Sequence, residues 1–270
     1  MPTYSHTHIP TNTDCETQNG KPLRCMKLKD EINLKTEDTI EERLHRIEER
    51  IAAACDRAGR DPSEVNLLPV SKTHPPDIVS EAAQLGLTVF GENRIQEARK
   101  KIPMCPGHLK WHLIGHLQTN KAKYVPRLFE MVHSVDSMRV LDALEKSCSD
   151  SGRIMQVMIE VNMAGEGSKF GISPEALPDL LLKANEMPHI EPVGLMTMPP
   201  FREDPEKVRP IFRETRLLRD SAADETGIPL EHLSMGMTHD FEVAIEEGST
   251  WIRIGTGLFG KRGSPWKPRE

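Results

Sequence analysis

The chain has 270 residues, a formal net charge of −6 and 37% hydrophobic residues, a composition typical of soluble globular proteins. Since domains average roughly 150 residues, this length predicts one large domain or two small ones. The acidic balance argues against a generally basic nucleic-acid-binding surface. No apolar run approaches the roughly 20 residues that a membrane-spanning helix needs. We therefore expect no nucleic-acid partner and no membrane partner.

The cysteine content and the N-terminal segment indicate a cytoplasmic protein. The five cysteines are odd in number and irregularly spaced, which does not fit a disulfide framework. The first residues are polar and lack the apolar core of a secretion signal. A reducing cytoplasm is the simplest compartment for such a sequence.

The N-terminal part of the chain differs in character from the rest. Residues 1–35 are rich in Thr, Asn, Pro and His and show no apolar periodicity, so we expect a disordered tail. Order is expected to begin near Thr36. The spacing of the next apolar residues predicts one buried face of a helix, made by Ile40, Leu44, Ile47 and Ile51.

From residue 66 onward the sequence alternates between short β-rich runs and helical stretches. Several β-rich runs are almost continuously apolar, as expected of strands buried on both faces. The predicted strands are Asn66–Lys72, Thr88–Asn93, Lys110–Gly115, Met131–Asp136, Met155–Asn162, Glu191–Met198, His232–Met237 and Trp251–Thr256. The predicted helices between and after them are Ile78–Leu85, Ile95–Lys101, Asn120–Leu128, Ser137–Ser147, Pro174–Asn185, Pro205–Thr226 and Phe241–Glu247.

Eight strands alternating with helices form either an open doubly wound sheet or a closed barrel. No G-x-G-x-x-G motif follows the first strand, so the dinucleotide-binding open sheet loses its main support. The strand number and the length predict a single α/β domain, a (β/α)8 TIM-type barrel over residues 36–263, followed by a C-terminal tail at 264–270. The helix that contains Ile40 would be an extra N-terminal element that closes the barrel floor.

In such barrels the active site lies at the carboxyl ends of the strands. Lys72 ends the first predicted strand, after the apolar run Leu67-Leu68-Pro69-Val70-Ser71. Apolar walls would lower the pKa of its amine, and a neutral amine is the form that attacks an aldehyde to give a Schiff base. The alternative is a lysine whose ammonium group reaches solvent from the strand end.

The last two predicted strands end in residues suited to phosphate. Strand seven leads into Thr238, while strand eight carries Arg253 and leads into Gly255 and Thr256. Glycine lets backbone N–H groups approach phosphate oxygens, and threonine adds a hydroxyl donor. Ordinary turn residues are the alternative, but both segments fall where barrels of this type bind phosphate. With Lys72 they suggest pyridoxal 5'-phosphate (PLP), or a lysine-dependent aldolase acting on a sugar phosphate.

A series of short segments, found in order within residues 36–263, is distinctive. They are Val70-Ser71-Lys72-Thr73, Phe90-Gly91-Glu92-Asn93, Trp111-His112-Leu113-Ile114-Gly115, Leu117-Gln118-Thr119-Asn120-Lys121, Ser168-Lys169-Phe170-Gly171, Leu195-Met196-Thr197-Met198, Leu233-Ser234-Met235-Gly236-Met237-Thr238 and Ile252-Arg253-Ile254-Gly255-Thr256. Together they closely resemble the YggS/PROSC family, the pyridoxal phosphate homeostasis proteins.

The resemblance implies a PLP protein of fold type III, with a single barrel like the N-terminal domain of alanine racemase. It implies that PLP is held as a Schiff base on Lys72 and that its phosphate lies near Thr238, Gly255 and Thr256. It also implies that Arg253 faces the pyridine nitrogen. Since arginine has donors and no acceptor, that nitrogen would stay unprotonated and the ring would be a weaker electron sink.

Two other positions are informative within the resemblance. Asn93 ends the second predicted strand, where a polar residue either caps a turn or contacts the cofactor, and the resemblance favours the contact. His116 stands where family members often have proline, and Thr238 stands where serine is commoner, which keeps the hydroxyl. Neither departure affects the cofactor prediction.

The favoured function is a carrier that holds PLP for intracellular PLP homeostasis and cofactor supply, with PLP-dependent apo-enzymes as candidate partners. The alternatives are an amino-acid racemase or decarboxylase with weak activity, and a Schiff-base aldolase with Asp136 as its acid or base. Racemases of this fold take a tyrosine from a second domain, whereas here the tyrosines are Tyr4 in the tail and Tyr124 in a helix. We therefore predict a non-enzyme, and a monomer or weak dimer.

Three histidines at a spacing of four, His108, His112 and His116, resemble a zinc-binding pattern on a helix. The segment around them is predicted to be a strand, however, and at about 3.3 Å per residue neighbouring histidines would lie roughly 13 Å apart. We therefore predict no metal site.

Overall fold

The structure is a computed structural model that describes residues 38–165, 170–261 and Trp266. The tail predicted for residues 1–35 lies outside the described residues. So does the predicted C-terminal tail at 264–270, except for Trp266.

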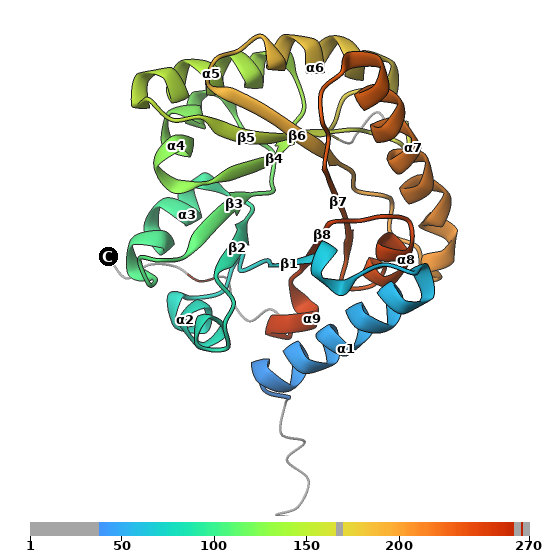
Figure 1. The fold of residues 1–270 in the computed structure, drawn as a ribbon. Coiled ribbons are helices and arrows are strands. Elements are labelled where there is room, and N and C mark those ends of the chain that lie inside the picture. Colours follow the sequence, from blue (N-terminus) through green and yellow to red (C-terminus); the bar gives the residue numbers. More distant parts are fainter. Residues whose placement is uncertain (1–37, 166–169, 262–265, 267–270) are drawn as a thin grey trace, which may run out of the picture. The chain divides into compact units, whose positions relative to one another are not determined.

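Parallel strands form a single sheet in the order β1-β8-β7-β6-β5-β4-β3-β2. Val70, directly after β1, bridges Gly91 of β2, and the Ser71 N–H donates to the Gly91 carbonyl at 3.1 Å. These contacts join the two ends of the strand order, so the sheet closes into the predicted eight-stranded barrel (Figure 1). The strands are β1 Asn66–Pro69, β2 Val89–Glu92, β3 Lys110–Leu113, β4 Met131–Val135, β5 Met155–Glu160, β6 Ile190–Met196, β7 His232–Met237 and β8 Trp251–Ile254.

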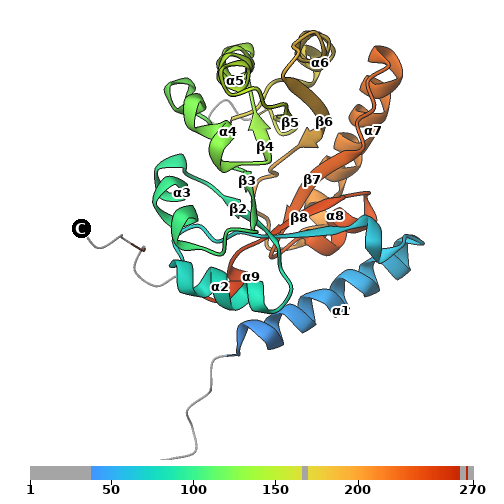
Figure 2. The same ribbon diagram turned by 60° about the vertical axis from the view of Figure 1, so that its left-hand side comes forward.

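The helices surround the strands as an outer layer (Figures 1 and 2). Nearly every predicted helix is present, and short 3-10 helices precede or follow several of them. The α-helices are α1 Ile40–Ala58, α2 Pro76–Gln84, α3 Ile95–Lys101, α4 Val125–Leu128, α5 Met138–Ser151, α6 Leu177–Asn185, α7 Arg209–Thr226, α8 Phe241–Glu246 and α9 Thr256–Phe259. The 3-10 helices are η1 Pro62–Glu64, η2 Ile102–Met104, η3 Thr119–Tyr124, η4 Pro174–Ala176 and η5 Pro205–Val208.

Helix α1 follows directly from its sequence. Thr39 caps its first turn by accepting a hydrogen bond from the Glu42 N–H, and the Glu42 carboxylate in turn accepts from the Thr39 N–H. Gly59 ends the helix in the left-handed conformation, with φ of 64°. The four apolar residues that predicted the helix, Ile40, Leu44, Ile47 and Ile51, are all buried.

The position of α1 differs from the prediction. The helix does not close the floor of the barrel; it packs against α8, α9 and α2 in the outer layer (Figure 1). Arg50 and Arg57 of α1 form salt bridges with Glu242 and Glu246 of α8, at 2.8 and 2.7 Å. The physical reason is that α9 is a single turn, so α1 covers the part of the barrel wall that a longer last helix would cover.

The strand and helix ends also differ from the prediction. Strand β7 has its predicted bounds, whereas the other seven strands end one to three residues early, because the last predicted residues of these strands belong to turns at the barrel mouth. Thr256, predicted as the end of the last strand, begins α9. The helix predicted over Asn120–Leu128 is a 3-10 helix that continues into one α-helical turn, with Pro126 inside that turn.

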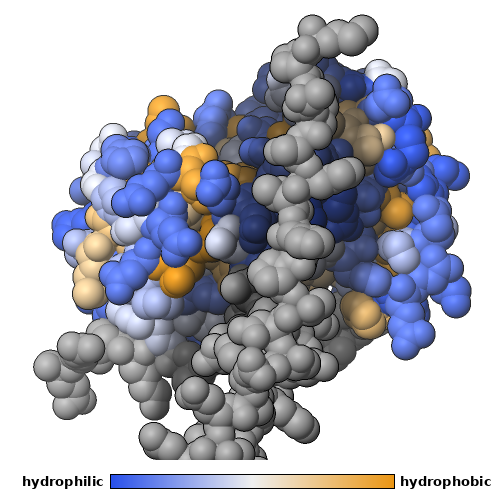
Figure 3. Space-filling view, turned by 90° about the horizontal axis from the view of Figure 1, so that it is seen from below, coloured by the Kyte–Doolittle hydropathy of each residue, from blue (hydrophilic) through white to orange (hydrophobic). Residues whose placement is uncertain are grey.

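The surface near α1 is mainly hydrophilic, as expected of the outer face of an amphipathic helix (Figure 3). Among the helices in the described ranges, none is both long and apolar enough to cross a membrane.

Candidate functional site

The six predicted site residues line one cavity of about 210 Å³ at the carboxyl ends of the strands. They are Lys72, Asn93, Thr238, Arg253, Gly255 and Thr256. Apolar side chains at the ends of β1, β3, β6 and β7 complete the wall, together with the polar residues His74, His239 and Asp240. The residues that sequence analysis selected from the ends of four strands therefore meet at one place.

Lys72 lies in a tight turn directly after β1 and is half-buried. The His74 N–H donates to the Ser71 carbonyl at 3.0 Å and closes the turn. The third residue of the turn, Thr73, has a φ of 70°, a region that β-branched residues rarely adopt. The turn directs the lysine to the cavity that it lines.

Arg253 is the buried cation of the site, with only 4% of its surface exposed. Its Nη1 donates to the carbonyl oxygen of Ser234 at 2.6 Å and to the hydroxyl of Ser234 at 2.7 Å, and its Nη2 donates to the Thr197 carbonyl at 3.0 Å. Burial lowers the pKa of Arg253 to about 10, and the carboxylates of Glu160 and Asp240 oppose this shift. The guanidinium is therefore a fixed, protonated donor at neutral pH.

The loops after β7 and β8 lie against each other at the cavity. The Thr238 hydroxyl accepts a hydrogen bond from the Gly257 N–H at 3.2 Å. A Cβ on Gly257 would lie 2.9 Å from Thr238 Cγ2, so glycine permits this close approach. Thr256, which begins α9, lines the same cavity. The loops bring two threonines and a glycine to one end of the site.

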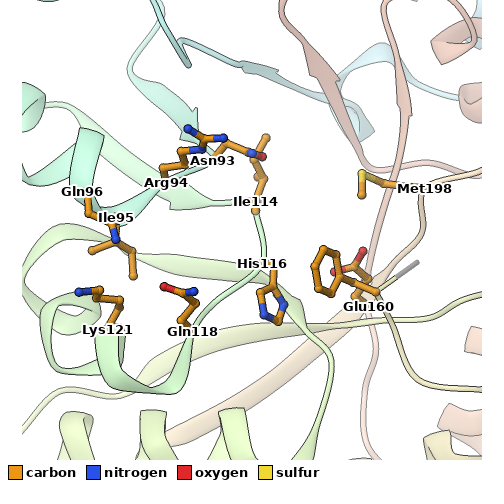
Figure 4. A pocket seen from close by; sticks show the side chains of 12 residues that line it. Asn93, Arg94, Ile95, Gln96, Ile114, His116, Gln118, Lys121, Glu160 and Met198 are labelled. Atoms are coloured by element: carbon orange, nitrogen blue, oxygen red, sulfur yellow. The ribbon is translucent and has the colours of Figure 1, made fainter. Parts of the chain in front are cut away.

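Asn93 belongs both to this cavity and to a second one of about 590 Å³ beside it. A Cβ on Gly115 would lie 2.7 Å from Asn93 Cγ, so Gly115 leaves room for the amide. Figure 4 shows this second cavity, with Gln118 and Lys121 on one side and Met198 on the other.

Titratable groups surround the second cavity. Burial raises the pKa of Glu160 to about 7, while Arg253 opposes the shift and Asp136 reinforces it. His116 is 2.7 Å from Asp136, and its ring stacks on Phe170 with centroids 4.0 Å apart. The histidine that departs from the family pattern is thus a lining residue of the second cavity.

Sequence analysis missed a buried chain of polar groups inside the barrel. His112 Nδ1 lies 3.0 Å from His133 Nε2, and His133 Nδ1 lies 2.9 Å from the Ser234 hydroxyl that Arg253 contacts. Burial lowers the pKa of His112 to about 3 and lowers that of His133 well below its usual value. The signal in the sequence was a polar residue in the middle of each of three largely apolar strands, β3, β4 and β7.

The histidines at a spacing of four do not converge. His112 points to His133 inside the barrel, whereas His116 pairs with Asp136 at the mouth. Within residues 38–165 and 170–261, no group of three metal-binding side chains is close enough to hold a metal ion.

The donors in the first cavity fit a phosphorylated aromatic aldehyde. Two threonines and a glycine can supply hydrogen bonds for an anion, the guanidinium of Arg253 is a fixed donor, and a lysine amine is the nucleophile that bonds aldehydes. Val70, Ile114, Met198 and Met237 supply apolar contact for a ring. PLP has a phosphate, an aldehyde and an aromatic ring, so the residues present fit this cofactor.

Comparison with known proteins agrees with this chemistry. The family model described as "Alanine racemase, N-terminal domain" matches residues 43–263. A protein of Aquifex aeolicus called pyridoxal phosphate homeostasis protein is 49% identical over 222 residues, which is 82% of this chain and 97% of that protein. This chain belongs to the pyridoxal phosphate homeostasis protein family. It therefore shares the family of the YggS/PROSC proteins that its segments resemble.

Solved structures extend the comparison from sequence to fold. The structure of PipY from Synechococcus elongatus with PLP bound is 35% identical, with a TM-score of 0.69, and the match covers 79% of this chain and 100% of PipY. An alanine racemase of Clostridium difficile is 13% identical with a TM-score of 0.65, and shares the fold over 56% of its own length. The family member described here thus has the barrel of the racemase.

Proposed function

We propose that this protein binds PLP, holds it covalently on Lys72, and serves in intracellular PLP homeostasis and cofactor supply. The observation that carries the proposal is the single cavity that joins Lys72, Arg253 and the Thr238 and Thr256 loops. Membership of the homeostasis family and the PLP-bound state of PipY support it.

Each lining residue has a distinct part in this proposal. The amine of Lys72 bonds the aldehyde, which supplies the reversible covalent attachment. Thr238 and Thr256 donate hydrogen bonds to the phosphate, and Arg253 presents a fixed donor to the pyridine nitrogen. Asn93, between the two cavities, contacts the cofactor edge.

We also propose that the protein does not catalyse reactions of amino acids. Racemisation needs an acid or base on each face of the substrate. Tyr124, the tyrosine within the described residues, lines neither of the two cavities, and Arg99 lies 3.8 Å over its ring on the outer side of the barrel. A donor-only arginine at the pyridine nitrogen would also weaken carbanion stabilisation by the bound ring.

The proposal also covers the compartment, the oligomeric state and the partners of the protein. We place the protein in the cytoplasm, as a monomer or weak dimer that passes PLP to apo-enzymes needing it. The carrier role requires reversible binding, and a Schiff base between an amine and an aldehyde reverses by addition of water.

The deciding experiment is chemical trapping. The purified protein is incubated with PLP, reduced with borohydride and mapped by mass spectrometry, with the absorption spectrum recorded before and after reduction. A pyridoxyl group on the peptide of Lys72 is expected, and Lys72→Ala should abolish it. A label found only on other lysines would refute the assignment of Lys72.

A further inference from the structure

Close to Lys72, but outside both cavities, lies a buried charged cluster of Lys101, Glu92 and Glu97. The side chains of Lys101 and Glu92 have no exposed surface, and that of Glu97 is 16% exposed. Lys101 Nζ lies 2.7 Å from Glu92 Oε1 and 2.7 Å from Glu97 Oε1. Burial raises the pKa of the Glu92 carboxyl, and the charge of Lys101 opposes this shift. Because buried ion pairs contribute little net stability over apolar side chains, this cluster calls for another explanation.

The cluster forms hydrogen bonds with the residues on both sides of Lys72. Lys101 Nζ donates to the Ser71 carbonyl at 2.8 Å, and the Ser71 hydroxyl donates to Glu92 Oε1 at 2.6 Å. On the other side, the Thr73 N–H donates to Glu97 Oε1 at 2.6 Å. The three charged side chains thus contact the turn directly before and directly after Lys72.

The turn that they hold is strained. Thr73 has a φ of 70°, at a turn position that usually carries glycine or asparagine. Its hydroxyl is buried and finds no hydrogen-bond partner among the described residues. Its carbonyl accepts a hydrogen bond from the Trp266 N–H at 3.1 Å. Since a strained backbone persists only where its surroundings fix it, the contacts at Ser71 and Thr73 maintain the turn.

The position of the turn matters for bond formation. In the proposed function, the Lys72 amine adds to the aldehyde carbon of PLP, a carbon–nitrogen double bond forms, and the aldehyde oxygen leaves as water. The loops at Thr238 and Thr256, which would hold the phosphate, follow β7 and β8 and are separate from the turn that carries Lys72. A shift of the lysine by about 1 Å would therefore separate the reacting atoms while the rest of the ligand stays bound.

We propose that Lys101, together with Glu92 and Glu97, positions Lys72 for its bond to the aldehyde of PLP. The inference rests on the proposed function and deepens it. Lys101 is a positioning residue, since it acts through the turn and lines neither cavity.

The test compares two ligands that differ only at the reacting group. One is PLP, and the other is 4-deoxypyridoxine 5'-phosphate, which has a methyl group in place of the aldehyde. Their dissociation constants are measured for the native protein, for Lys101→Met and for Lys100→Met. Lys100 is the exposed neighbour of Lys101 on the same helix and serves as the matched control.

The expected result is specific to the aldehyde. Lys101→Met should weaken PLP binding about ten-fold or more, or 1.4 kcal/mol, and reduce the Schiff-base absorption band. Binding of the deoxy analogue should change by no more than about two-fold, and Lys100→Met should alter neither ligand. Equal loss for both ligands, or no loss for PLP, would overturn the proposal.

A second pair of variants keeps the test decisive if Lys101→Met does not fold. Glu97→Ala removes the acceptor of the Thr73 N–H at a partly exposed position, while Glu97→Gln keeps an oxygen in its place. Glu97→Ala should show the aldehyde-specific loss, and Glu97→Gln should restore most of the PLP affinity. Equal behaviour of the two variants would contradict the positioning role. If the native protein shows no preference for PLP over the deoxy analogue, the proposed function itself fails.

Discussion

His133 Nδ1 lies 2.9 Å from the hydroxyl oxygen of Ser234, deep inside the barrel. The same hydroxyl accepts a hydrogen bond from Arg253, which has no acceptor of its own. The hydroxyl proton is therefore available for His133 Nδ1, which leaves the His133 Nε2–H to donate to His112 Nδ1 at 3.0 Å. One arginine thus orders the hydrogen bonds of two buried histidines.

Replacement of Ser234 tests how much this chain of hydrogen bonds contributes to the stability of the protein. Ser234→Ala leaves His133 Nδ1 without its partner and removes one of the acceptors of Arg253. The free energy of unfolding should fall by about 1–3 kcal/mol, the usual cost of a buried group that loses its hydrogen bond. Urea unfolding measures the change. A change below about 0.5 kcal/mol would show that the chain of hydrogen bonds does not contribute to stability.

The buried histidines also predict how stability depends on pH. The pKa of His112 is lowered to about 3 in the folded state, against about 6.5 in the unfolded chain. Below pH 6.5 the unfolded chain binds a proton that the folded protein does not, so the free energy of unfolding falls as the pH falls. The slope from this residue is up to about 1.4 kcal/mol per pH unit between pH 6.5 and 3. The lowered pKa of His133 acts in the same direction.

Urea unfolding between pH 7 and 4 measures this dependence. His112→Phe, which keeps an aromatic ring beside Trp251, should give a shallower slope than the native protein. His45→Gln is the control, since the side chain of His45 is 73% exposed on α1, and its slope should match the native one. Identical slopes for all three proteins would contradict the assignment to His112.

The strained turn predicts a stabilising substitution. Thr73→Gly relieves a positive φ that costs a non-glycine residue about 1–2 kcal/mol and removes a buried hydroxyl without a partner. The greater freedom of glycine in the unfolded chain offsets about 0.4–1 kcal/mol of this gain. A net increase of about 1 kcal/mol in the free energy of unfolding is expected from urea titration. A loss of stability would show that the turn is not strained.

The proposed phosphate contact of Thr256 is tested by replacing threonine with valine, which has nearly the same shape. Thr256→Val removes one hydroxyl, and a hydrogen bond to a charged group contributes on the order of 1.5–3 kcal/mol. PLP binding should therefore weaken roughly ten-fold or more. Pyridoxal without phosphate is the control ligand and should bind the variant and the native protein alike. Equal losses for both ligands would show that this hydroxyl does not contact the phosphate.

Much of the site was predictable because the active sites of such barrels lie at the carboxyl ends of the strands. Lys72, Thr238 and Thr256 each follow an apolar strand, and closure of the barrel brings such residues together whatever their distance in sequence. The signal is local because a polar residue after an apolar run is visible within a few positions. Strands β1 to β8 form the predicted barrel, and helices alternate with them as expected.

The buried polar contacts were not predictable because their partners lie far apart in the sequence. Glu97 and Lys101 are four residues apart on α3, a spacing that suggests an exposed surface pair. Their burial depends on Ser71, which follows β1, and on Glu92, which ends β2. Likewise, no pattern near residue 73 reveals a positive φ, since a threonine there gives no sign of a turn that favours glycine.

The final prediction separates a PLP carrier from a PLP enzyme. Tyr124 lies in η3 and lines neither cavity, so it offers no base on the opposite face of a bound amino acid. Arg253, fixed by Ser234 and Thr197, is a donor-only partner for the pyridine nitrogen. Chiral chromatography should therefore show little or no racemisation of common amino acids by the loaded protein, and no decarboxylation or aldol cleavage. An apo-enzyme mixed with it should instead gain activity as it takes up PLP. Turnover of an amino acid at about 1–10³ per second, abolished by Lys72→Ala, would establish an enzyme in place of a carrier.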